Sequence, residues 1–301
     1  MAWLTDVPER IVSGRTKMGE KEESSMAELA VPIPDSIQSA LDAEIKRTGG
    51  TAAALVTKAL AQYLDVSIHT VFQISTSGAL VAGVYDREVN VTSILDHGDF
   101  GLGTFANLDG EMVVLDGKVY QVQGTGRVSE AAPDAGAPFA VVTRFSPDTD
   151  TRTLKVASFK ELEAQCDQHR QSGNIFYAVR LDGHFNRVRT RAVNPPSPGT
   201  RLVDAAKAQS EFTFDDVNGT LIGLWSPGFS SAFSVAGYHF HFLSDDRQHG
   251  GHVLDVVAGP LRLRVEALTD FHLALPESEA FLKADLSKNT AEELAYAEQA
   301  H

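Results

Sequence analysis

The strongest structural pattern in the chain lies in the segment Gly237-Tyr238-His239-Phe240-His241-Phe242-Leu243-Ser244-Asp245-Asp246-Arg247-Gln248-His249-Gly250-Gly251-His252-Val253-Leu254-Asp255. His239 and His241 alternate with aromatic residues, and residues i and i+2 of a β-strand share one face of the sheet. A polar, glycine-containing turn then leads to a second strand-like run that begins with His252. Folded as a hairpin, the two runs bring three imidazoles together.

Three neutral imidazoles on a rigid sheet, with a fourth position left open, form the ligand set of a catalytic Zn²⁺ site. A single buried histidine is more often a hydrogen-bonded core residue. Packing does not explain two histidines on one strand face with a third across a hairpin. The pattern does not name a reaction, because His-X-His with a distant third histidine also occurs in cupins and in carbonic anhydrase-like sites. We expect His249, in the turn, to be exposed and not to be a ligand.

Composition limits the classes of protein that the chain can represent. Its 301 residues allow one large or two modest domains, and a hydrophobic content of 43% is ample for a packed core. A formal charge of −14 disfavours nucleic acid and anionic membranes as partners. Cys166 is the only cysteine, which excludes an intrachain disulfide framework and a thiolate zinc cluster. With no signal-peptide pattern and no long apolar run, we expect a cytoplasmic protein.

The N-terminal part of the chain has its own pattern. Residues 1–26 are polar and charged, and we predict that they form a disordered lead-in. Residues 27–65 have alternating apolar residues at 29–33, followed by two helix-like segments separated by Gly49-Gly50. This order resembles ribbon-helix-helix domains, which dimerise by pairing the strand, but the strand lacks the polar side chains with which those domains read DNA. We expect a dimerisation arm and a homodimer; the alternative is a helical hairpin packed on the main domain.

Residues 66–301 form the expected catalytic domain. The fold class is α/β (α+β): two mixed or antiparallel β-layers with peripheral helices and the metal site between the layers. The clearest hairpin spans residues 111–122 around the turn pair Asp116-Gly117. A loop at 194–199 is a candidate boundary between halves of roughly 66–195 and 196–301. Further strands are predicted at 69–74, 176–181, 185–193, 219–225, 237–243, 252–258 and 261–267, and helices at 75–84, 159–170, 203–209, 277–284 and 291–300.

Two other groups of residues carry chemistry. A glycine-rich stretch at 98–111 leads into the hairpin and ends at Glu111; it is not a phosphate loop, because it lacks the P-loop lysine and no helix follows it. Alone, Glu111 would most often be a solvated carboxylate. Arg187, Arg189 and Arg191 alternate, which places three guanidiniums on one face of a strand. They form either a solvated face paired with acidic residues or, for one of them, a fork that binds a substrate carboxylate.

Together these motifs resemble the alpha-acetolactate decarboxylase family, from about Ile68 to the C-terminus. The segments that carry the resemblance are Gly101-Leu102-Gly103-Thr104-Phe105, Leu108-Asp109-Gly110-Glu111, Phe176-Tyr177-Ala178-Val179-Arg180-Leu181-Asp182-Gly183, Thr190-Arg191, Gly237-Tyr238-His239-Phe240-His241-Phe242 and Gly250-Gly251-His252-Val253-Leu254-Asp255. The resemblance implies that His239, His241 and His252 are zinc ligands. It also implies active-site roles for Glu111, Glu298, Arg191 and, close by, Thr104; within the acidic tail, Glu292 and Glu293 are alternative matches for Glu298.

The resemblance further implies decarboxylation of (S)-2-acetolactate to (R)-acetoin and CO₂. Zn²⁺ would act as a Lewis acid where enediolate charge develops, Arg191 would orient the carboxylate, and Glu111 or Glu298 would protonate one face. No organic cofactor is required, because a β-keto acid supplies its own electron sink. Fe²⁺, Co²⁺ or Mn²⁺ could occupy the same ligands. The competing interpretations are a cupin-like metal-dependent oxygenase or isomerase, and a dimeric regulator that senses a metabolite.

Overall fold

The computed structural model describes residues 30–49, 51–64, 69–197, 199–288 and 290–298. The chain divides into two compact units, Met1–Thr57 and Lys58–His301, and the boundary falls inside helix α2. Both predicted N-terminal helices are confirmed, as α1 (Asp35–Thr48) and α2 (Ala52–Tyr63). Residues 30–34 form no strand within the single chain, and the predicted strand, which would pair with that of a second chain, stays a prediction. A strand requires a hydrogen-bonded neighbour, and the described residues of this single chain supply none there.

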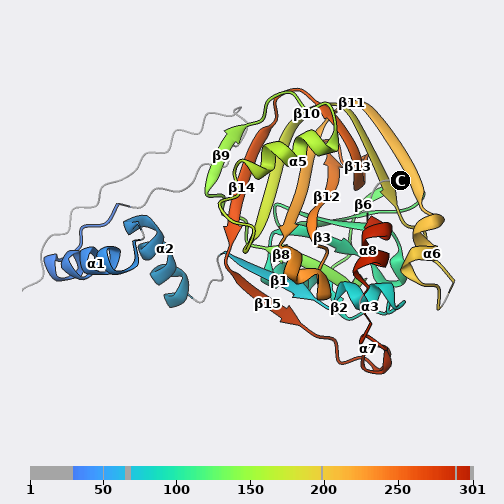
Figure 1. Ribbon diagram of the computed structural model, residues 1–301, viewed down its shortest axis with the longest axis horizontal. Coiled ribbons are helices and arrows are strands. Elements are labelled where there is room, and N and C mark those ends of the chain that lie inside the picture. The colour runs from blue at the N-terminus through green and yellow to red at the C-terminus, as the bar shows by residue number, and fades with distance from the viewer. Residues whose placement is uncertain (1–29, 50, 65–68, 198, 289, 299–301) are drawn as a thin grey trace, which may run out of the picture. The chain divides into compact units, whose positions relative to one another are not determined.

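Unit Lys58–His301 contains two large sheets, which form its layers (Figure 1). In the seven-stranded sheet, all neighbouring strands are antiparallel except β1 and β15, which are parallel. The predicted hairpin is formed by β4 and β5, and its turn residues Asp116 and Gly117 both have positive φ, 52° and 74°, as a tight hairpin turn requires. In spatial order, the strands are β15 (Asp270–Ala274), β1 (Thr70–Ile74), β8 (Phe139–Thr143), β3 (Phe100–Thr104), β4 (Glu111–Leu115), β5 (Lys118–Val122) and β6 (Val128–Glu130).

The six-stranded sheet is antiparallel and contains the histidine-bearing hairpin. Because β10 also pairs with β11 along its length, the strands β11, β12, β13 and β10 close on themselves. The candidate boundary at 194–199 lies between β10 and β11 in the sequence, and both strands belong to this sheet. Each of the two large sheets contains strands that precede this loop and strands that follow it. In spatial order, the strands are β11 (Ser210–Ser226), β12 (Gly237–Ser244), β13 (Gly250–Ala258), β10 (Phe176–Ala192), β14 (Arg262–Leu268) and β9 (Thr149–Arg152).

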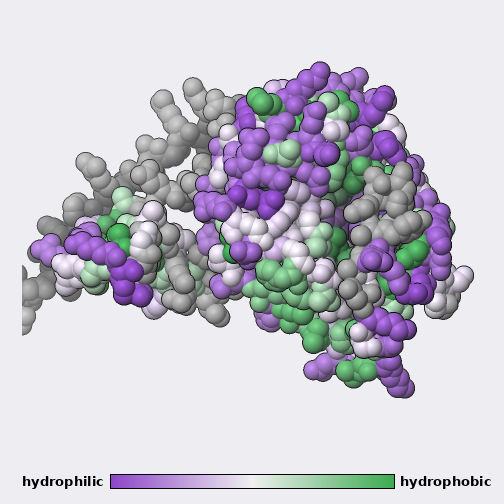
Figure 2. Space-filling view, in the orientation of Figure 1, coloured by the Kyte–Doolittle hydropathy of each residue, from purple (hydrophilic) through white to green (hydrophobic). Residues whose placement is uncertain are grey.

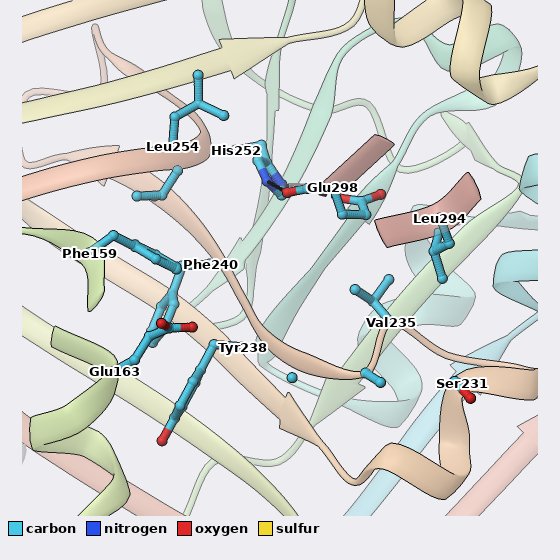
Figure 3. A pocket seen from close by; sticks show the side chains of 13 residues that line it. Phe159, Glu163, Ser231, Val235, Tyr238, Phe240, His252, Leu254, Leu294 and Glu298 are labelled. Carbon is cyan, nitrogen blue, oxygen red and sulfur yellow. Dashed lines mark hydrogen bonds and ion pairs between the residues drawn. The ribbon is translucent and has the colours of Figure 1, made fainter. Parts of the chain in front are cut away.

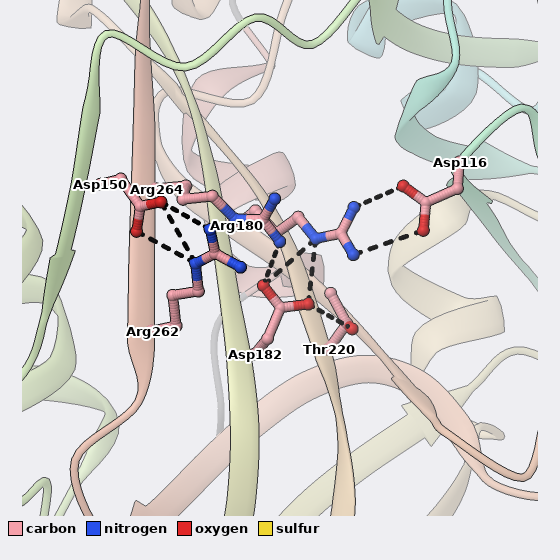
Figure 4. A network of polar contacts seen from close by, with 7 residues as sticks. All are labelled: Asp116, Asp150, Arg180, Asp182, Thr220, Arg262 and Arg264. Carbon is pink, nitrogen blue, oxygen red and sulfur yellow. Dashed lines mark hydrogen bonds and ion pairs between the residues drawn. The ribbon is translucent and has the colours of Figure 1, made fainter. Parts of the chain in front are cut away.

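The prediction of two separate strands at 176–181 and 185–193 is wrong, because β10 runs unbroken through Asp182 and Gly183. Gly183 pairs directly with Gly219 of β11, so no turn forms. The Asp182 carboxylate accepts hydrogen bonds from Arg180, Arg264 and Thr220 (Figure 4). Asp-Gly is common in turns, but here the Asp182 carboxylate is held by the charged side chains of Arg180 and Arg264, and the strand continues.

Helices lie at the periphery of the layers, and α5 packs on β13 (Figure 1). The two sheets pack face to face through contacts of β3 and β4 with β11, β12 and β13. The expected mixed α+β class is confirmed. The remaining elements of this unit are α3 (Ser77–Val81), β2 (Val89–Asn90), α4 (Val91–His97), η1 (Ala106–Leu108), β7 (Gly136–Ala137), α5 (Phe159–Asp167), α6 (Leu202–Lys207), η2 (Gly228–Ala232), α7 (Glu279–Lys283) and α8 (Ala291–Glu298).

The surface of this unit is mostly hydrophilic on the face shown in Figure 2, notably over α5, with a hydrophobic area in the region of η2 and β15. Phe229 of η2 is exposed, and so is Leu275, which follows β15. Among the helices built from described residues, none has both the length and the apolar character to cross a membrane.

Candidate metal centre and active site

Three imidazoles converge on the inner face of the six-stranded sheet. His239 and His241 lie on β12, and His241 pairs directly with His252 of β13. One ring nitrogen of each histidine lies within 4.8 Å of the others. The alternating aromatic residues face the other way, where Phe240 packs edge-on against Phe159 of α5. The predicted convergence is confirmed as geometry, and the cluster can bind a metal ion.

Two nitrogen–nitrogen separations in the cluster, and its hydrogen bonding, are compatible with a tetrahedral metal. Nε2 of His239 lies 3.2 Å from Nε2 of His241 and 3.0 Å from Nδ1 of His252. Metal–nitrogen bonds of about 2.0–2.1 Å in a tetrahedron give N–N separations of about 3.3 Å. The outer nitrogen of His241 lies 2.7 Å from the carbonyl of Met112, and that of His252 lies 3.1 Å from the carbonyl of Glu298. Each outer nitrogen therefore donates its proton to a carbonyl, which leaves the inner nitrogen as a lone-pair donor.

Burial keeps these imidazoles uncharged. It lowers the pKa of His239 to about 3, with a smaller contribution from the positive charge of Arg191. It also lowers the pKa of His241 to about 3, and it holds the pKa of His252 well below its usual value. Desolvation disfavours the protonated ring in each case. The three rings are therefore neutral near pH 7, which is the state that binds a metal.

Glu111 approaches the cluster from the opposite sheet. It begins β4, and its Oε2 lies 3.6 Å from Nε2 of His241. The residue is buried, and this burial raises the pKa of the Glu111 carboxyl to about 7, against the opposing effect of Arg191. Thr104 of β3 pairs with Glu111 across the sheet, but its hydroxyl donates to the carbonyl of Gly110, 2.8 Å away. Thr104 therefore lies beside the site with its hydroxyl proton directed to the backbone.

Only one of the three alternating arginines reaches the cluster. Arg187 pairs with Asp215 and Arg189 with Glu211, both on the neighbouring strand β11, and all four side chains are exposed to solvent, so these two arginines follow the solvated alternative. Arg191 is 4% exposed, and β10 has a register irregularity against β13 just before it, between Arg189 and Thr190.

The C-terminal helix α8 brings Glu298 to the same place. Its Oε2 lies 3.0 Å from Nη2 of Arg191, 3.5 Å from Nδ1 of His252 and 3.7 Å from Nε2 of His239. Glu293, one of the alternative matches, pairs instead with Arg201, and Glu292 is exposed. The structure therefore brings Glu298, rather than its neighbours, beside the three histidines.

His249 lies outside the cluster, but it is not exposed as expected. Its ring is half-buried and stacks on Phe214 with 4.5 Å between centroids. Some contacts of the site residues are not predicted by any sequence motif. These are the carbonyls of Met112 and Glu298 behind His241 and His252, and Gln209, whose Oε1 accepts from Nη1 of Arg191 at 2.7 Å.

Two cavities meet the site. The smaller, of about 40 Å³, is lined by Thr104, Glu111, Arg191, His239 and Glu298, together with apolar side chains such as Leu80, Leu108 and Val235. The larger, of about 490 Å³, reaches His252 and Glu298 at one end. Its other end is formed by Phe159, Glu163, Tyr238 and Phe240 (Figure 3). Glu111, Arg191 and His239 therefore line the small cavity, and Glu298 lines both cavities.

Comparison with known proteins agrees with this arrangement. The sequence profile of the alpha-acetolactate decarboxylase family matches residues 71–288, a range that includes the three histidines, Glu111 and Arg191 and ends before Glu298. Alpha-acetolactate decarboxylases from Methylococcus capsulatus and Methanosarcina mazei are each 40% identical to the chain, over 76% of its length and 89% and 80% of theirs.

A crystal structure of alpha-acetolactate decarboxylase from Bacillus subtilis superimposes with a TM-score of 0.74 at 33% identity. It covers 77% of this chain and all of the other. A structure from the subspecies spizizenii gives the same TM-score at 34% identity. The chain belongs to the alpha-acetolactate decarboxylase family.

Proposed function

We propose that this protein decarboxylates 2-acetolactate to acetoin and CO₂, which makes it a carboxy-lyase. The observation that carries the proposal is the convergence of three neutral imidazoles with Glu111, Arg191 and Glu298 around one small cavity. The proposed substrate carries a carboxylate, a hydroxyl and a ketone on adjacent carbons. A guanidinium, a metal site and a carboxyl group match these three functions.

His239, His241 and His252 would hold the metal, and we propose Zn²⁺. Imidazole nitrogens at tetrahedral spacing support this choice, because Zn²⁺ combines such ligands with an open fourth position. Bound there, Zn²⁺ supplies a Lewis acid for substrate oxygens that gain negative charge as CO₂ leaves.

Arg191 would bind the substrate carboxylate. Its side chain is buried and lines the small cavity, and a planar fork of N–H donors recognises a carboxylate with defined orientation. Holding the carboxylate fixes the angle between the breaking C–C bond and the neighbouring ketone. Bond cleavage is fastest when that bond is perpendicular to the carbonyl plane, so this orientation lowers the barrier.

Glu111 is our choice for the proton donor. Glu298 is engaged in an ion pair with Arg191, whereas Glu111 is buried and its contact with the cluster is to the uncharged ring of His241. Burial raises the pKa of the Glu111 carboxyl to about 7, so this group can carry a proton near neutral pH. Delivery of a proton from a fixed carboxyl to one face of the intermediate gives a single enantiomer of acetoin. We propose (R)-acetoin from (S)-2-acetolactate.

The test is direct. Metal-loaded protein is incubated with 2-acetolactate, and the rate of CO₂ release and the enantiomeric composition of acetoin are measured. A chelator-treated sample and a sample reloaded with Zn²⁺ provide the controls. We expect one enantiomer from the loaded protein and loss of activity with the chelator. Absence of acetoin from the loaded protein would overturn the proposal, and undiminished activity after complete metal removal would overturn the role of the metal.

A further inference from the structure

The guanidinium of Arg191 donates some of its N–H groups to protein acceptors and leaves others without a partner among the described residues. Both hydrogens of Nη1 have acceptors, Oε1 of Gln209 at 2.7 Å and the carbonyl of Ala297. Nη2 donates to Oε2 of Glu298 at 3.0 Å. Nε is buried and has no partner among the described residues.

The free donors are thus the Nε hydrogen and one Nη2 hydrogen. Nε and Nη2 share one edge of the guanidinium, where an N–H from each can point in parallel. Two parallel N–H groups match the two oxygens of a carboxylate. A buried donor without a partner costs free energy, and none of the described residues supplies an acceptor to Nε, so this edge of Arg191 suits an acceptor from a ligand. A substrate carboxylate meets that requirement.

Gln209 stands on a braced piece of backbone. It follows α6, where its amide donates to the carbonyl of Ala206, and it immediately precedes β11. Asn194 secures both neighbours, because its Nδ2 donates to the carbonyl of Ala208 and to the hydroxyl of Ser210, each at 3.0 Å. The backbone from which the Gln209 side chain reaches Arg191 is therefore fixed on both sides at the end of a sheet.

We propose that Gln209 is a positioning residue: its Oε1 holds Nη1 and so turns the Nε–Nη2 edge of Arg191 towards the substrate carboxylate. This inference rests on the proposed function of Arg191. Without Gln209, one Nη1 hydrogen loses its acceptor and the guanidinium rotates more freely, which weakens a two-point contact much more than a single-point contact.

The decisive variant is Gln209→Met, which keeps the length of the side chain and removes the acceptor. Two inhibitors report on the two halves of the site. 2-Hydroxy-2-methylpropanoate has the hydroxyl and carboxylate but no ketone, and acetoin has the hydroxyl and ketone but no carboxylate. We expect inhibition by the first to weaken about tenfold, the scale of one hydrogen bond to a charged group, and inhibition by acetoin to stay unchanged. The KM for acetolactate should rise, with metal content unaltered.

Gln165→Met is the matched control. Gln165 lies on α5 and is half-buried, as Gln209 is, but its side-chain amide bonds the backbone of Leu154 and Lys155. The Gln165→Met variant should therefore leave both inhibition constants unchanged. Gln209→Asn, one methylene shorter, tests the same contact with the amide retained and should reproduce the selective loss. Equal weakening of both inhibitors, or of neither, would overturn the role of Gln209. A wild-type protein without turnover would instead overturn the proposed function.

Discussion

Each of two histidines divides its ring nitrogens between the cluster and the backbone. In His241 the outer nitrogen donates to Met112 and the inner one faces the other rings, and His252 repeats this arrangement with the carbonyl of Glu298. A local alternation pattern places the rings on one face, but the backbone carbonyls select which nitrogen is the lone-pair donor. The site therefore needs neutral rings in a defined tautomer, and burial supplies the neutrality.

Replacing His241 by alanine should remove both bound metal and CO₂ release, because two imidazoles hold a divalent metal far more weakly than three. Metal content by elemental analysis and acetoin formation measure the two effects. His249→Ala is the control, since His249 stacks on Phe214 outside the cluster and should retain both properties. Full activity in a metal-free His241→Ala protein would refute the metal mechanism.

Arg191→Lys keeps the positive charge but loses the fork. We expect kcat/KM for acetolactate to fall about 100-fold, because the carboxylate is bound without fixed orientation, while the metal stays bound. Steady-state kinetics together with metal content check both parts. Arg189→Lys, at the exposed Glu211 pair on the same strand, should behave as wild type. Unchanged kinetics in Arg191→Lys would remove Arg191 from the site.

Helix α8 contributes main-chain carbonyls to the site in addition to the Glu298 carboxylate. Its main-chain carbonyls accept from Arg191 and His252, and its Glu298 side chain meets Arg191. Leu294 and Ala297 of the same helix are buried in the core beneath it. The short helix thus supports a metal ligand and the guanidinium through its backbone, so the identity of one residue describes only part of its role.

Two variants separate these contributions. Glu298→Ala removes the carboxylate but keeps the carbonyl that accepts from His252, whereas a chain ending at Lys288 removes both. Loss of such an outer hydrogen bond weakens metal binding by about 10- to 100-fold. We expect the truncated protein to bind Zn²⁺ more weakly than Glu298→Ala by that factor in a competition titration with a chelator. Equal affinities would show that the carbonyl does not support His252.

Asp182 pairs with two arginines at the point of β10 where the sequence predicted a turn. The carboxylate is shared by Arg180 and Arg264, whose side chains are 14% and 8% exposed. Asp182→Ala leaves both guanidiniums without this partner, and we expect a loss of about 2 kcal/mol in the free energy of unfolding, reduced from the value for a fully buried pair because Asp182 is partly solvated. Urea unfolding measures it. Asp150→Ala, at the more exposed Arg262 pair, should cost less than about 1 kcal/mol.

The molecule places its site where the two layers of unit Lys58–His301 meet. The six-stranded sheet contributes the histidines and Arg191, the seven-stranded sheet contributes Glu111, and α8 contributes Glu298. Residues far apart in the sequence therefore share one cavity, and the layers bury their side chains. That burial raises the pKa of Glu111 and lowers the pKa values of the histidines, which is the electrostatic basis of the site.

The dimerisation arm predicted at residues 27–65 stays a proposal. In its described residues, Val31, Ile33 and Ile37 are exposed apolar side chains before and in α1, and so small a unit buries little surface alone. Val31→Glu with Ile33→Glu should convert a dimer to a monomer in sedimentation velocity, since a charge in an apolar contact is costly. Leu154→Glu, at an exposed apolar residue of the other unit, should stay dimeric. A monomeric wild type, or a dimer unaffected by the paired change, would refute the arm.

The sequence alone determined the features that depend on local periodicity. Alternation along β12 put two imidazoles on one face, Asp116-Gly117 specified a hairpin turn, and apolar spacing with flanking glycine specified α1. These patterns depend only on neighbours along the chain, so they survive without knowledge of the fold.

Only the tertiary structure decided what depends on contacts across the chain. It buried Arg191 while leaving Arg187 exposed, carried Glu298 rather than Glu293 to the histidines, and kept β10 continuous through Asp182. Burial and long-range pairing set these outcomes. Burial and strand pairing both depend on contacts between residues distant in sequence, so a local sequence pattern does not predict them.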